Sequence, residues 1–214
     1  MPRTRVHNLN ISLDGYAAGE YVTLDAPIGD AGRLFAGFDG RFIHGIDKAD
    51  APVTLDRVLT STWAQGIGAE IMGRRKFGPQ TGDWPDDGWR GWWGDEPPFL
   101  TPVFVMTHHP RPPIEFANGT SFHFVGGAPR EVLGLAQEAA GDLDVRLGGG
   151  PSTIRQFLDA DLVDVMHLVI KPVTLGRGVS LWEGLSGVED RFTVETIASP
   201  SGLTHQLWNR NVPA

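Results

Sequence analysis

The sequence contains no cysteine, no long apolar run and no excess of positive charge, and each absence removes a class of protein. Without cysteine there is no disulfide, no thiol nucleophile and no cysteine-ligated zinc, which favours a cytoplasmic location. No run of about 18 apolar residues exists, so we expect no membrane span. The polar start, MPRTRVHNLN, lacks the apolar core of a signal peptide. A net charge of -8 argues against non-specific binding of nucleic acid.

The remaining composition is that of an ordinary globular chain. Its 214 residues are enough to bury a substantial core, and 41% of them are hydrophobic. We therefore do not expect an intrinsically disordered protein. The chain shows no internal repeat and no clean linker. We therefore predict a single domain over residues 1–214.

Strand-like and helix-like segments alternate along this domain. Apolar runs and alternation predict strands at 5–13, 69–72, 103–106, 121–125, 144–147 and 162–173, and a C-terminal antiparallel hairpin from 192–198 and 203–208. Helical spacing predicts helices at 54–65 (with Thr54 as N-cap), 129–141 and 154–162, and a short helix near 30–38 within a long loop over 19–53. Such alternation is typical of an α/β fold with a mostly parallel sheet covered on both faces.

The segment 147–153, LGGGPST, is the first candidate binding motif. A strand feeds three glycines, Gly148, Gly149 and Gly150, and a helix then begins with the hydroxyl residues Ser152 and Thr153. Glycines let a phosphate approach the backbone, and a helix start offers free N–H groups. The alternative interpretation is a tight strand-to-helix turn in which Ser152 or Thr153 caps the helix.

A second candidate is the densest basic cluster in this acidic chain, formed by Gly73, Arg74, Arg75 and Lys76. It follows a short predicted strand and precedes a predicted helix. Three cations in this position suit a pyrophosphate or a 2′-phosphate, because arginine can grip a phosphate with two parallel hydrogen bonds. A solvated basic turn is the competing interpretation.

A third candidate, Thr107-His108-His109-Pro110-Arg111, follows the strand at 103–106. Ligands of open α/β sheets bind at the carboxyl ends of the strands, so Thr107, His108 and Arg111 could hold a phosphate there. We do not expect a metal site, because adjacent histidines point in different directions and no third ligand is near in sequence.

Four tryptophans, Trp84, Trp89, Trp92 and Trp93, gather in one proline- and glycine-rich loop. We favour a role in packing or in a subunit interface over substrate contact. Together with the strand at 162–173 and the C-terminal hairpin they offer much apolar surface. This predicts a homodimer.

Five motifs occur in one order from about residue 5 to residue 210: Ser12–Gly15, Met72–Gly78, Val105–Thr107, Arg146–Gly150, and Asp164–Pro172 followed by Leu175–Gly178. In this order they resemble the RibD C-terminal/dihydrofolate reductase family. The resemblance implies a central, mostly parallel eight-stranded sheet flanked by helices and an NADPH-dependent reduction of a small molecule. The substrate would be the aminopyrimidine of riboflavin biosynthesis, 5-amino-6-(5-phosphoribosylamino)uracil, or a pteridine resembling dihydrofolate.

The resemblance also implies roles for the three motifs. The segments matching Gly73–Phe77 and Gly148–Gly150 hold the NADPH pyrophosphate in relatives, and the segment matching Thr107–Arg111 holds the 2′-phosphate. The substrate residues depart from the family, since Asn8 stands where the riboflavin reductases have lysine and Gly148 stands nearest their glutamate. Asp30 could serve as the catalytic acid of a dihydrofolate reductase, or it could be a helix N-cap. These departures leave a second hypothesis open, a catalytically silent nucleotide- or ligand-binding module.

Overall fold

The computed structural model describes residues 2–35, 52–85 and 88–211. Its strands are β1 (Thr4–Ser12), β2 (Tyr16–Ala18), β3 (Ile67–Gly73), β4 (Pro102–Met106), β5 (Ile114–Glu115), β6 (Ser121–Val125), β7 (Asp144–Gly149), β8 (Val165–Lys171), β9 (Val179–Ser180), β10 (Phe192–Ala198) and β11 (Thr204–Arg210). Its helices are α1 (Leu55–Thr60), α2 (Arg74–Phe77), α3 (Pro129–Ala140) and α4 (Pro151–Asp159), with 3-10 turns η1 (Gly32–Leu34) and η2 (Glu189–Arg191).

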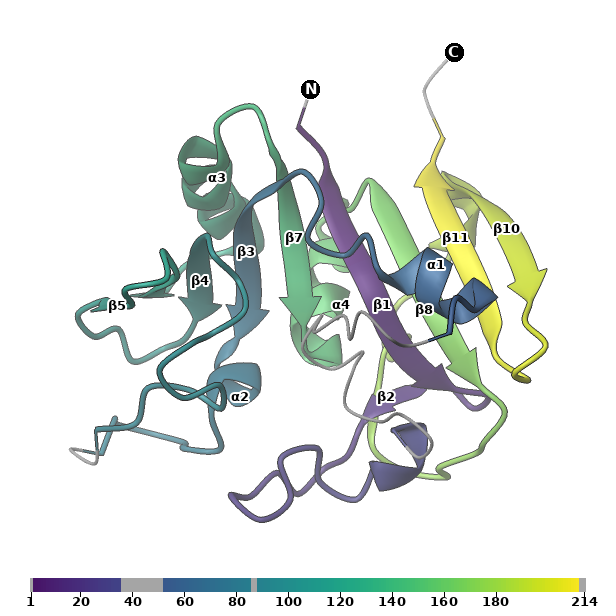
Figure 1. Cartoon of the computed structure of the whole chain (residues 1–214), viewed down its shortest axis with the longest axis horizontal. Coiled ribbons are helices and arrows are strands. Elements are labelled where there is room, and N and C mark those ends of the chain that lie inside the picture. The colour runs from purple at the N-terminus through teal and green to yellow at the C-terminus, as the bar shows by residue number, and fades with distance from the viewer. Residues whose placement is uncertain (1, 36–51, 86–87, 212–214) are drawn as a thin grey trace.

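Nine of these strands form one sheet in the order β10-β11-β8-β1-β7-β3-β4-β6-β5 (Figure 1). The six strands from β8 to β6 run parallel, and β11, β10 and β5 join antiparallel at the two edges. The remaining two strands, β2 and β9, pair with each other in a small separate sheet. The α/β class, the mostly parallel sheet and the C-terminal hairpin are thus confirmed, and the two-residue edge strand β5 raises the expected eight strands to nine.

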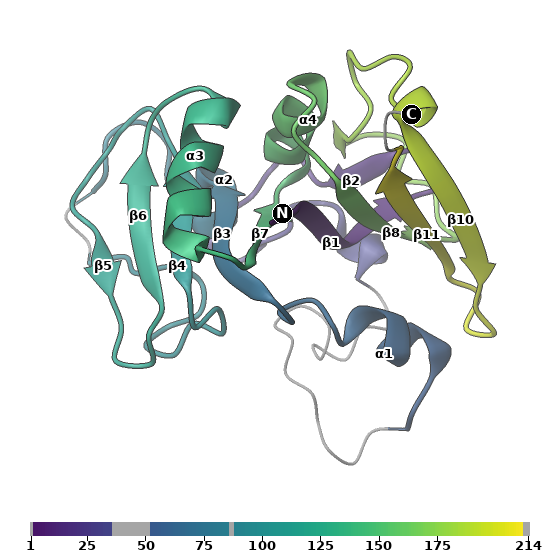
Figure 2. The same ribbon diagram turned by 90° about the horizontal axis from the view of Figure 1, so that it is seen from above.

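Helices cover both faces of the sheet. In Figure 2, α3 and α4 lie on one face and α1 on the other. The larger core fills the space beneath α3 and α4, where Val132, Ala136, Ile154 and Phe157 are buried against the central strands. A second core of aromatic residues, centred on Phe77 and Phe122, lies beside β4 and β6.

The local chemistry explains the ends of the helices and where the sequence-based bounds were wrong. Thr54 caps α1 as expected, accepting a hydrogen bond from the backbone N–H of Arg57. The predicted bounds were wrong at both helices: α1 ends at Thr60 instead of residue 65, and α4 lies three residues earlier than predicted, with the positive φ of Asp161 (58°) just after its end. The helix expected near 30–38 is the single 3-10 turn η1, and residues 36–51 lie outside the described residues.

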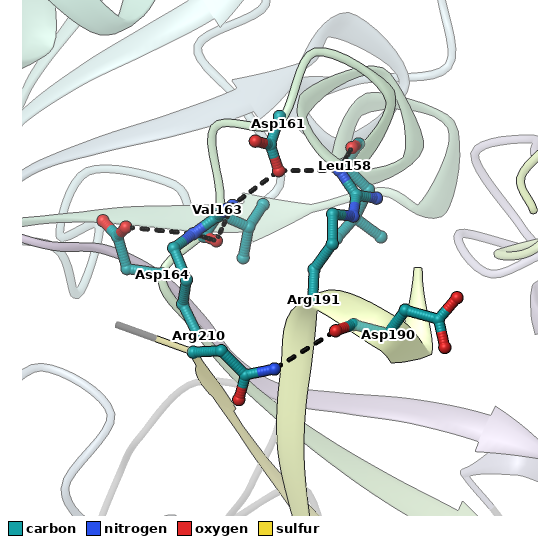
Figure 3. Close-up of polar contacts among 8 residues, drawn as sticks. Leu158, Asp161, Val163, Asp164, Asp190, Arg191 and Arg210 are labelled. Atoms are coloured by element: carbon teal, nitrogen blue, oxygen red, sulfur yellow. Dashed lines mark hydrogen bonds and ion pairs between the residues drawn. The ribbon is translucent and has the colours of Figure 1, made fainter. Parts of the chain in front are cut away.

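A polar cluster joins the end of α4 to the C-terminal hairpin (Figure 3). The Asp161 carboxylate accepts hydrogen bonds from Arg191 (2.7 Å) and Arg210 (2.8 Å). Arg210 also donates from Nε to the carbonyl of Val163 (2.8 Å). Two arginines from distant segments therefore share one carboxylate, which holds β11 and η2 against the turn that leads into β8.

We expect Asp161→Ala to lower the free energy of unfolding more than Asp161→Gly does. The glycine variant loses only the half-exposed ion pairs, which lowers the free energy of unfolding by no more than about 1 kcal/mol. Alanine loses the same pairs and must also adopt φ 58°, which adds roughly 1 kcal/mol. Urea unfolding of both variants measures the difference, and equal stabilities would contradict it.

The same pair of variants has a defined pH dependence. The hydrogen bonds from Arg210, the largest cause, and from Arg191 hold the pKa of Asp161 below its usual value. Its contribution is therefore full above the unfolded-state pKa and is lost as the pH falls through the folded-state pKa. The destabilisation in Asp161→Gly should shrink accordingly in acid.

Candidate active site

The sheet opens into a cleft of about 900 Å³ at the carboxyl ends of β1, β3, β4 and β7. This is the edge at which open α/β sheets bind their ligands. The cleft brings together most of the predicted site residues, from all three motifs. Those that line it are Gly73, Arg74, Arg75, Lys76, Thr107, His108, Gly148, Gly149, Gly150, Ser152 and Thr153.

The charge of the cleft is opposite to that of the whole chain. Its lining carries Arg74, Arg75, Lys76 and Arg146, and among the described residues it includes no aspartate or glutamate. A cavity with cations and no carboxylate on its wall, in a chain of net charge -8, favours an anionic ligand over a cationic one.

The glycine turn forms one wall of this cleft, between the end of β7 and the start of α4. Gly149 has φ 108°, a conformation that side chains rarely adopt. Gly150 is the N-cap of α4, and a Cβ placed on it would meet no atom within 4 Å. A Cβ on Gly73 would overlap the Thr153 hydroxyl, so the end of β3 lies directly against the first turn of α4. The backbone here is thus bare toward the cleft, as a phosphate site requires.

Lys76 links the basic cluster to this turn, because its ammonium group donates to the carbonyl of Gly148 (2.6 Å). Burial of the ammonium, and secondarily the positive charge of Arg146, lower the pKa of Lys76 to about 8, against the opposing effect of Glu70. A negatively charged ligand in the cleft would favour the charged form and raise this pKa again.

Arg74 and Arg111 both stack on Trp84. Their guanidinium carbons lie 3.8 Å and 4.0 Å from a ring centroid of that indole. Arg74 lines the cleft, whereas Arg111 lies outside the lining, against Phe124 (4.2 Å), and donates to the carbonyl of Trp89 (3.1 Å). Arg111 therefore supports the aromatic wall behind Arg74, and the direct phosphate contact predicted for it remains without structural support.

Thr107 begins the turn after β4. Its hydroxyl accepts a hydrogen bond from the backbone N–H of His109 (3.0 Å), and His109 pairs through Nδ1 with Asp83 (2.8 Å). His108 is exposed at the rim of the cleft. The turn is therefore organised by its own side chains and presents the imidazole of His108 to a ligand.

Two charged residues that the sequence did not single out lie beneath the glycine turn. Glu70 on β3 is 1% exposed, and its Oε2 accepts a hydrogen bond from Arg146 on β7 (2.7 Å). A Cβ on Gly148 would overlap Oε1 of Glu70. Gly148 is therefore required because a carboxylate from the neighbouring strand occupies the place of its side chain. Only the cross-strand register, which pairs Glu70 with Arg146, reveals this contact.

The far end of the cleft is lined by His7, Asn8 and Asn10 from β1 and by Trp63, whose ring lies 4.3 Å from the Arg146 guanidinium carbon. Asn8 sits at a bulge with φ 54°, and its amide nitrogen donates to the carbonyl of Thr60 (2.8 Å). The side-chain oxygens of Asn8 and Asn10 are buried and have no hydrogen-bond partner within the described chain. This end thus offers polar atoms to a second ligand.

Asp30 does not belong to the described lining. Its carboxylate pairs with Arg177 (2.8 Å) and accepts from the backbone N–H of Glu20 (3.1 Å). The N-cap interpretation is wrong, since Ala31 precedes η1 and no side chain caps it. Asp30 instead fastens the loop after β2 to the segment before β9.

The tryptophans divide between packing and the cleft. Trp84, Trp89 and Trp93 pack against the aromatic core, while Trp92 and Trp93 also line the cleft. Packing within the subunit, one of the two roles favoured from sequence, is therefore what the fold uses for three of them.

Comparison with known families identifies the family of this chain. The model of the RibD C-terminal domain matches residues 4–197, which include every motif of the cleft. The chain belongs to the RibD C-terminal domain family. A search of the curated proteins finds no match to this chain.

Solved structures share the fold at low sequence identity. A putative riboflavin biosynthesis protein from Shewanella sp. PV-4 is 22% identical, with a TM-score of 0.58. The match covers 98% of this chain and 99% of that one. A dihydrofolate reductase from Enterococcus faecalis, complexed with NADP(H) and RAB-propyl, is 14% identical, with a TM-score of 0.51 and coverages of 98% and 96%. A diaminohydroxyphosphoribosylaminopyrimidine deaminase/5-amino-6-(5-phosphoribosylamino)uracil reductase from Thermotoga maritima is 16% identical, with a TM-score of 0.51. The match covers 98% of this chain and 57% of that protein, so this chain spans a little over half of its length.

The contact between Gly148 and Glu70 generates a prediction for stability. Gly148→Ala should cost about 1–3 kcal/mol because its methyl group overlaps the carboxylate. Glu70→Ala should cost about 3–5 kcal/mol because it leaves Arg146 buried without its partner. The double variant should cost less than the two single costs together, by about 1 kcal/mol or more.

Urea unfolding of the four proteins measures this coupling. Gly134 on α3 is the matched control, because a Cβ there meets no atom within 4 Å, so Gly134→Ala and Glu70→Ala should be additive. Additivity of Gly148→Ala with Glu70→Ala would show that the two side-chain positions do not compete.

Proposed function

We propose that this chain is an NADPH-dependent reductase of a small unsaturated heterocycle, an aminopyrimidine of the riboflavin pathway or a pteridine resembling dihydrofolate. The observation that carries the proposal is the cationic lining of the cleft, without carboxylate among its described residues, beside a bare glycine turn at the start of a helix. Membership of the RibD C-terminal domain family supports the same reaction class. A cytosolic location, favoured by the absence of cysteine, goes with this proposal.

The residues present fit the phosphates of NADPH. Two guanidinium nitrogens of Arg74, Nε and one Nη, are buried and have no hydrogen-bond partner in the described part of the chain, so they are available as donors. Gly150 leaves the first turn of α4 open, and Ser152 adds a hydroxyl there. Arg75 and His108 would hold further phosphate oxygens at the rim. When bound, NADPH supplies the hydride, and the protein positions it and keeps water away.

A second hypothesis is a ligand-binding module without turnover. It is motivated by Asn8, whose amide is engaged by Thr60 where the riboflavin reductases have a lysine, and by Gly148 in place of their glutamate. NADPH titration followed by cofactor oxidation across a panel of heterocycles separates the two hypotheses. Binding without oxidation of NADPH by any acceptor would favour the module.

We expect NADPH to bind more tightly than NADH, because the extra phosphate meets Arg74, Arg75 and His108. Arg74→Ala should weaken NADPH binding by about 1.5–3 kcal/mol, which is roughly 10- to 150-fold in Kd, the usual value of a charged hydrogen bond. Fluorescence titration with both cofactors measures these constants.

Arg130 supplies the control for this titration, since it is exposed on α3 and does not line the cleft. Arg130→Ala should leave both constants unchanged. Equal affinity of the wild type for NADPH and NADH would remove the argument for a 2′-phosphate site.

We also propose that the chain forms a homodimer. The tryptophans contribute less to this proposal than their number suggested, because three of the four pack against the aromatic core of their own subunit. Support comes from β10, the outermost strand, on which residues 193–196 are all exposed, Val194 among them. An uncovered strand edge of this length readily pairs with a second copy.

Light scattering at low micromolar concentration should therefore give twice the 23.2 kDa mass of the chain. Val194→Lys on β10 should shift the protein toward the monomer, whereas Leu135→Lys, at an exposed position on α3, should not. A monomeric mass for the wild type would rule the dimer out.

A further inference from the structure

One cation of the cleft stands apart from the basic cluster. Arg74, Arg75 and Lys76 follow β3, whereas Arg146 lies within β7 and reaches the lining from beneath the glycine turn. Its side chain is 11% exposed, so most of the guanidinium is enclosed by the protein. Because arginine stays charged at neutral pH, the use that each of its nitrogens finds decides what Arg146 can bind.

The three guanidinium nitrogens of Arg146 have different surroundings. Nη1 donates to Oε2 of Glu70 (2.7 Å), and Nε is buried without a hydrogen-bond partner in the described chain. Nη2 also has no partner among the described residues, but it is not buried. Since Arg146 lines the cleft, Nη2 is the donor that remains for a ligand.

Two contacts hold this guanidinium in place. Glu70, which is 1% exposed, binds one of its edges from the neighbouring strand, where the register of β3 and β7 pairs the two residues. The ring of Trp63 lies 4.3 Å from the guanidinium carbon. A donor fixed in this way needs little reorganisation when negative charge develops in front of it, and this property makes a hydrogen-bond donor catalytically effective.

Arg146 contacts the far end of the cleft. Trp63, its aromatic partner, lines the same end as His7 and Asn10. Burial, then Arg5 and then Arg146 lower the pKa of His7 to about 4, so His7 is neutral at pH 7. Of the charged groups in the described lining, Arg146 is therefore the one that serves this end.

A reductase has to stabilise the negative charge that a hydride brings to its acceptor. When the hydride adds to a C=C or C=N bond conjugated with a carbonyl group, an electron pair moves onto the carbonyl oxygen. A charged donor binds that oxygen more strongly in the transition state than in the neutral ground state, so it accelerates the step. No carboxylate lines the described part of the cleft to oppose this effect.

We propose that Nη2 of Arg146 binds the carbonyl oxygen of the acceptor and stabilises the negative charge that develops there during reduction. The inference rests on the proposed function, and it narrows the acceptor to a ring in which the reducible bond is conjugated with a carbonyl group. Glu70 and Trp63 are positioning residues, because they act through the guanidinium of Arg146.

The atoms and electrons of this step balance. NADPH supplies the hydride, which forms the new C–H bond while the π bond at that carbon breaks. The electron pair of the π bond moves to the carbonyl oxygen beside Nη2, and a proton from water completes the addition. The acceptor gains two electrons and NADP⁺ is the other product, while Arg146 keeps its charge throughout.

A phosphate of the cofactor is the other anion that Nη2 could bind. The contact of Arg146 with Trp63, at the far end of the cleft, favours the acceptor. The two assignments differ in which constant they change. Loss of a phosphate contact raises the Kd for NADPH, whereas loss of a contact made in the transition state slows hydride transfer at an unchanged Kd.

Arg146→Lys tests the assignment while keeping the charge. A lysine ammonium can pair with Glu70, but it has no second, rigidly placed donor for the cleft. We expect single-turnover oxidation of NADPH by an acceptor to slow roughly 100-fold, while the Kd for NADPH changes less than about twofold. A wild-type rate in the folded variant would overturn this inference alone, and so would a tenfold higher Kd for NADPH with an unchanged rate.

The double variant Glu70→Met/Arg146→Met covers the case in which Arg146→Lys does not fold. It removes both buried charges together, which proteins tolerate far better than the loss of one partner. It should show the same loss of rate at an unchanged Kd for NADPH. A wild type that binds NADPH but reduces no acceptor would overturn the proposed function and this inference with it.

Arg155→Lys is the matched control. Arg155 on α4 also pairs with a glutamate, Glu183 (2.6 Å), and it does not line the cleft. This variant should oxidise NADPH at the wild-type rate. A rate that falls as far as in Arg146→Lys would show that any arginine–glutamate pair supports the reaction only through the fold, and it would overturn the inference.

A measurement without cofactor tests the donor itself. Pteridine-2,4-dione is a cyclic imide whose ionisation changes its absorbance, and its anion carries negative charge on the carbonyl oxygens. Bound against the guanidinium of Arg146, its pKa should fall by about one unit or more. A spectroscopic pH titration of this probe should show the fall with the wild type and not with Glu70→Met/Arg146→Met. An equal fall with both proteins, or none with the wild type, would overturn the assignment whatever the activity.

Discussion

A buried carboxylate and a buried guanidinium, Glu70 and Arg146, face each other across β3 and β7 beneath the glycine turn. The carboxylate occupies the place of a side chain on residue 148, so the turn above it must be bare. The guanidinium, held at 2.7 Å by that carboxylate, stacks on Trp63 and contributes positive charge to the cleft. The glycine turn depends on this one ion pair, and so does the placement of Lys76, which donates to the carbonyl of Gly148.

Each of the two hydrophobic cores supports a different wall of the cleft. The aliphatic core beneath α3 and α4 fixes β7 and α4, and with them the backbone of the glycine turn. The aromatic core fixes Phe77 and Trp84, and through Trp84 the guanidinium of Arg74. The backbone donors and the side-chain cations of the site are therefore supported by separate clusters, so a change in one cluster need not move the other wall.

The sequence predicts the elements whose patterns are local. The glycine turn, the basic cluster and the segment after β4 could be identified because each joins a buried strand to a distinctive run of residues, and the parallel sheet brings the strand ends together. The helix capped by Thr54 follows from capping chemistry in the same way. In the sequence, by contrast, Glu70 is only one residue inside a predicted strand. Its role in the site comes from the residue opposite it on β7.

The same limit explains why the sequence does not predict a row of three histidines or the surroundings of Asp30. His7, His167 and His205 are 160 and 38 residues apart, and only the strand order β1-β8-β11 places their rings in a row. Asp30 was singled out by analogy across a poorly matched loop, and its ion pair with Arg177 depends on how that loop crosses the segment before β9. Interactions across strands and between loops are set by register and topology, which no local pattern contains.

The contrast between an acidic body and a cationic cleft has a consequence for selectivity. At physiological ionic strength the field of a charge extends only about 8 Å, so an approaching polyanion meets the repulsion of the outer surface before it meets the cations of the cleft. A long polynucleotide cannot bend its backbone into a space of about 900 Å³, whereas a single nucleotide can enter it. We therefore expect the depth at which the positive charges lie to favour small anions over RNA and DNA.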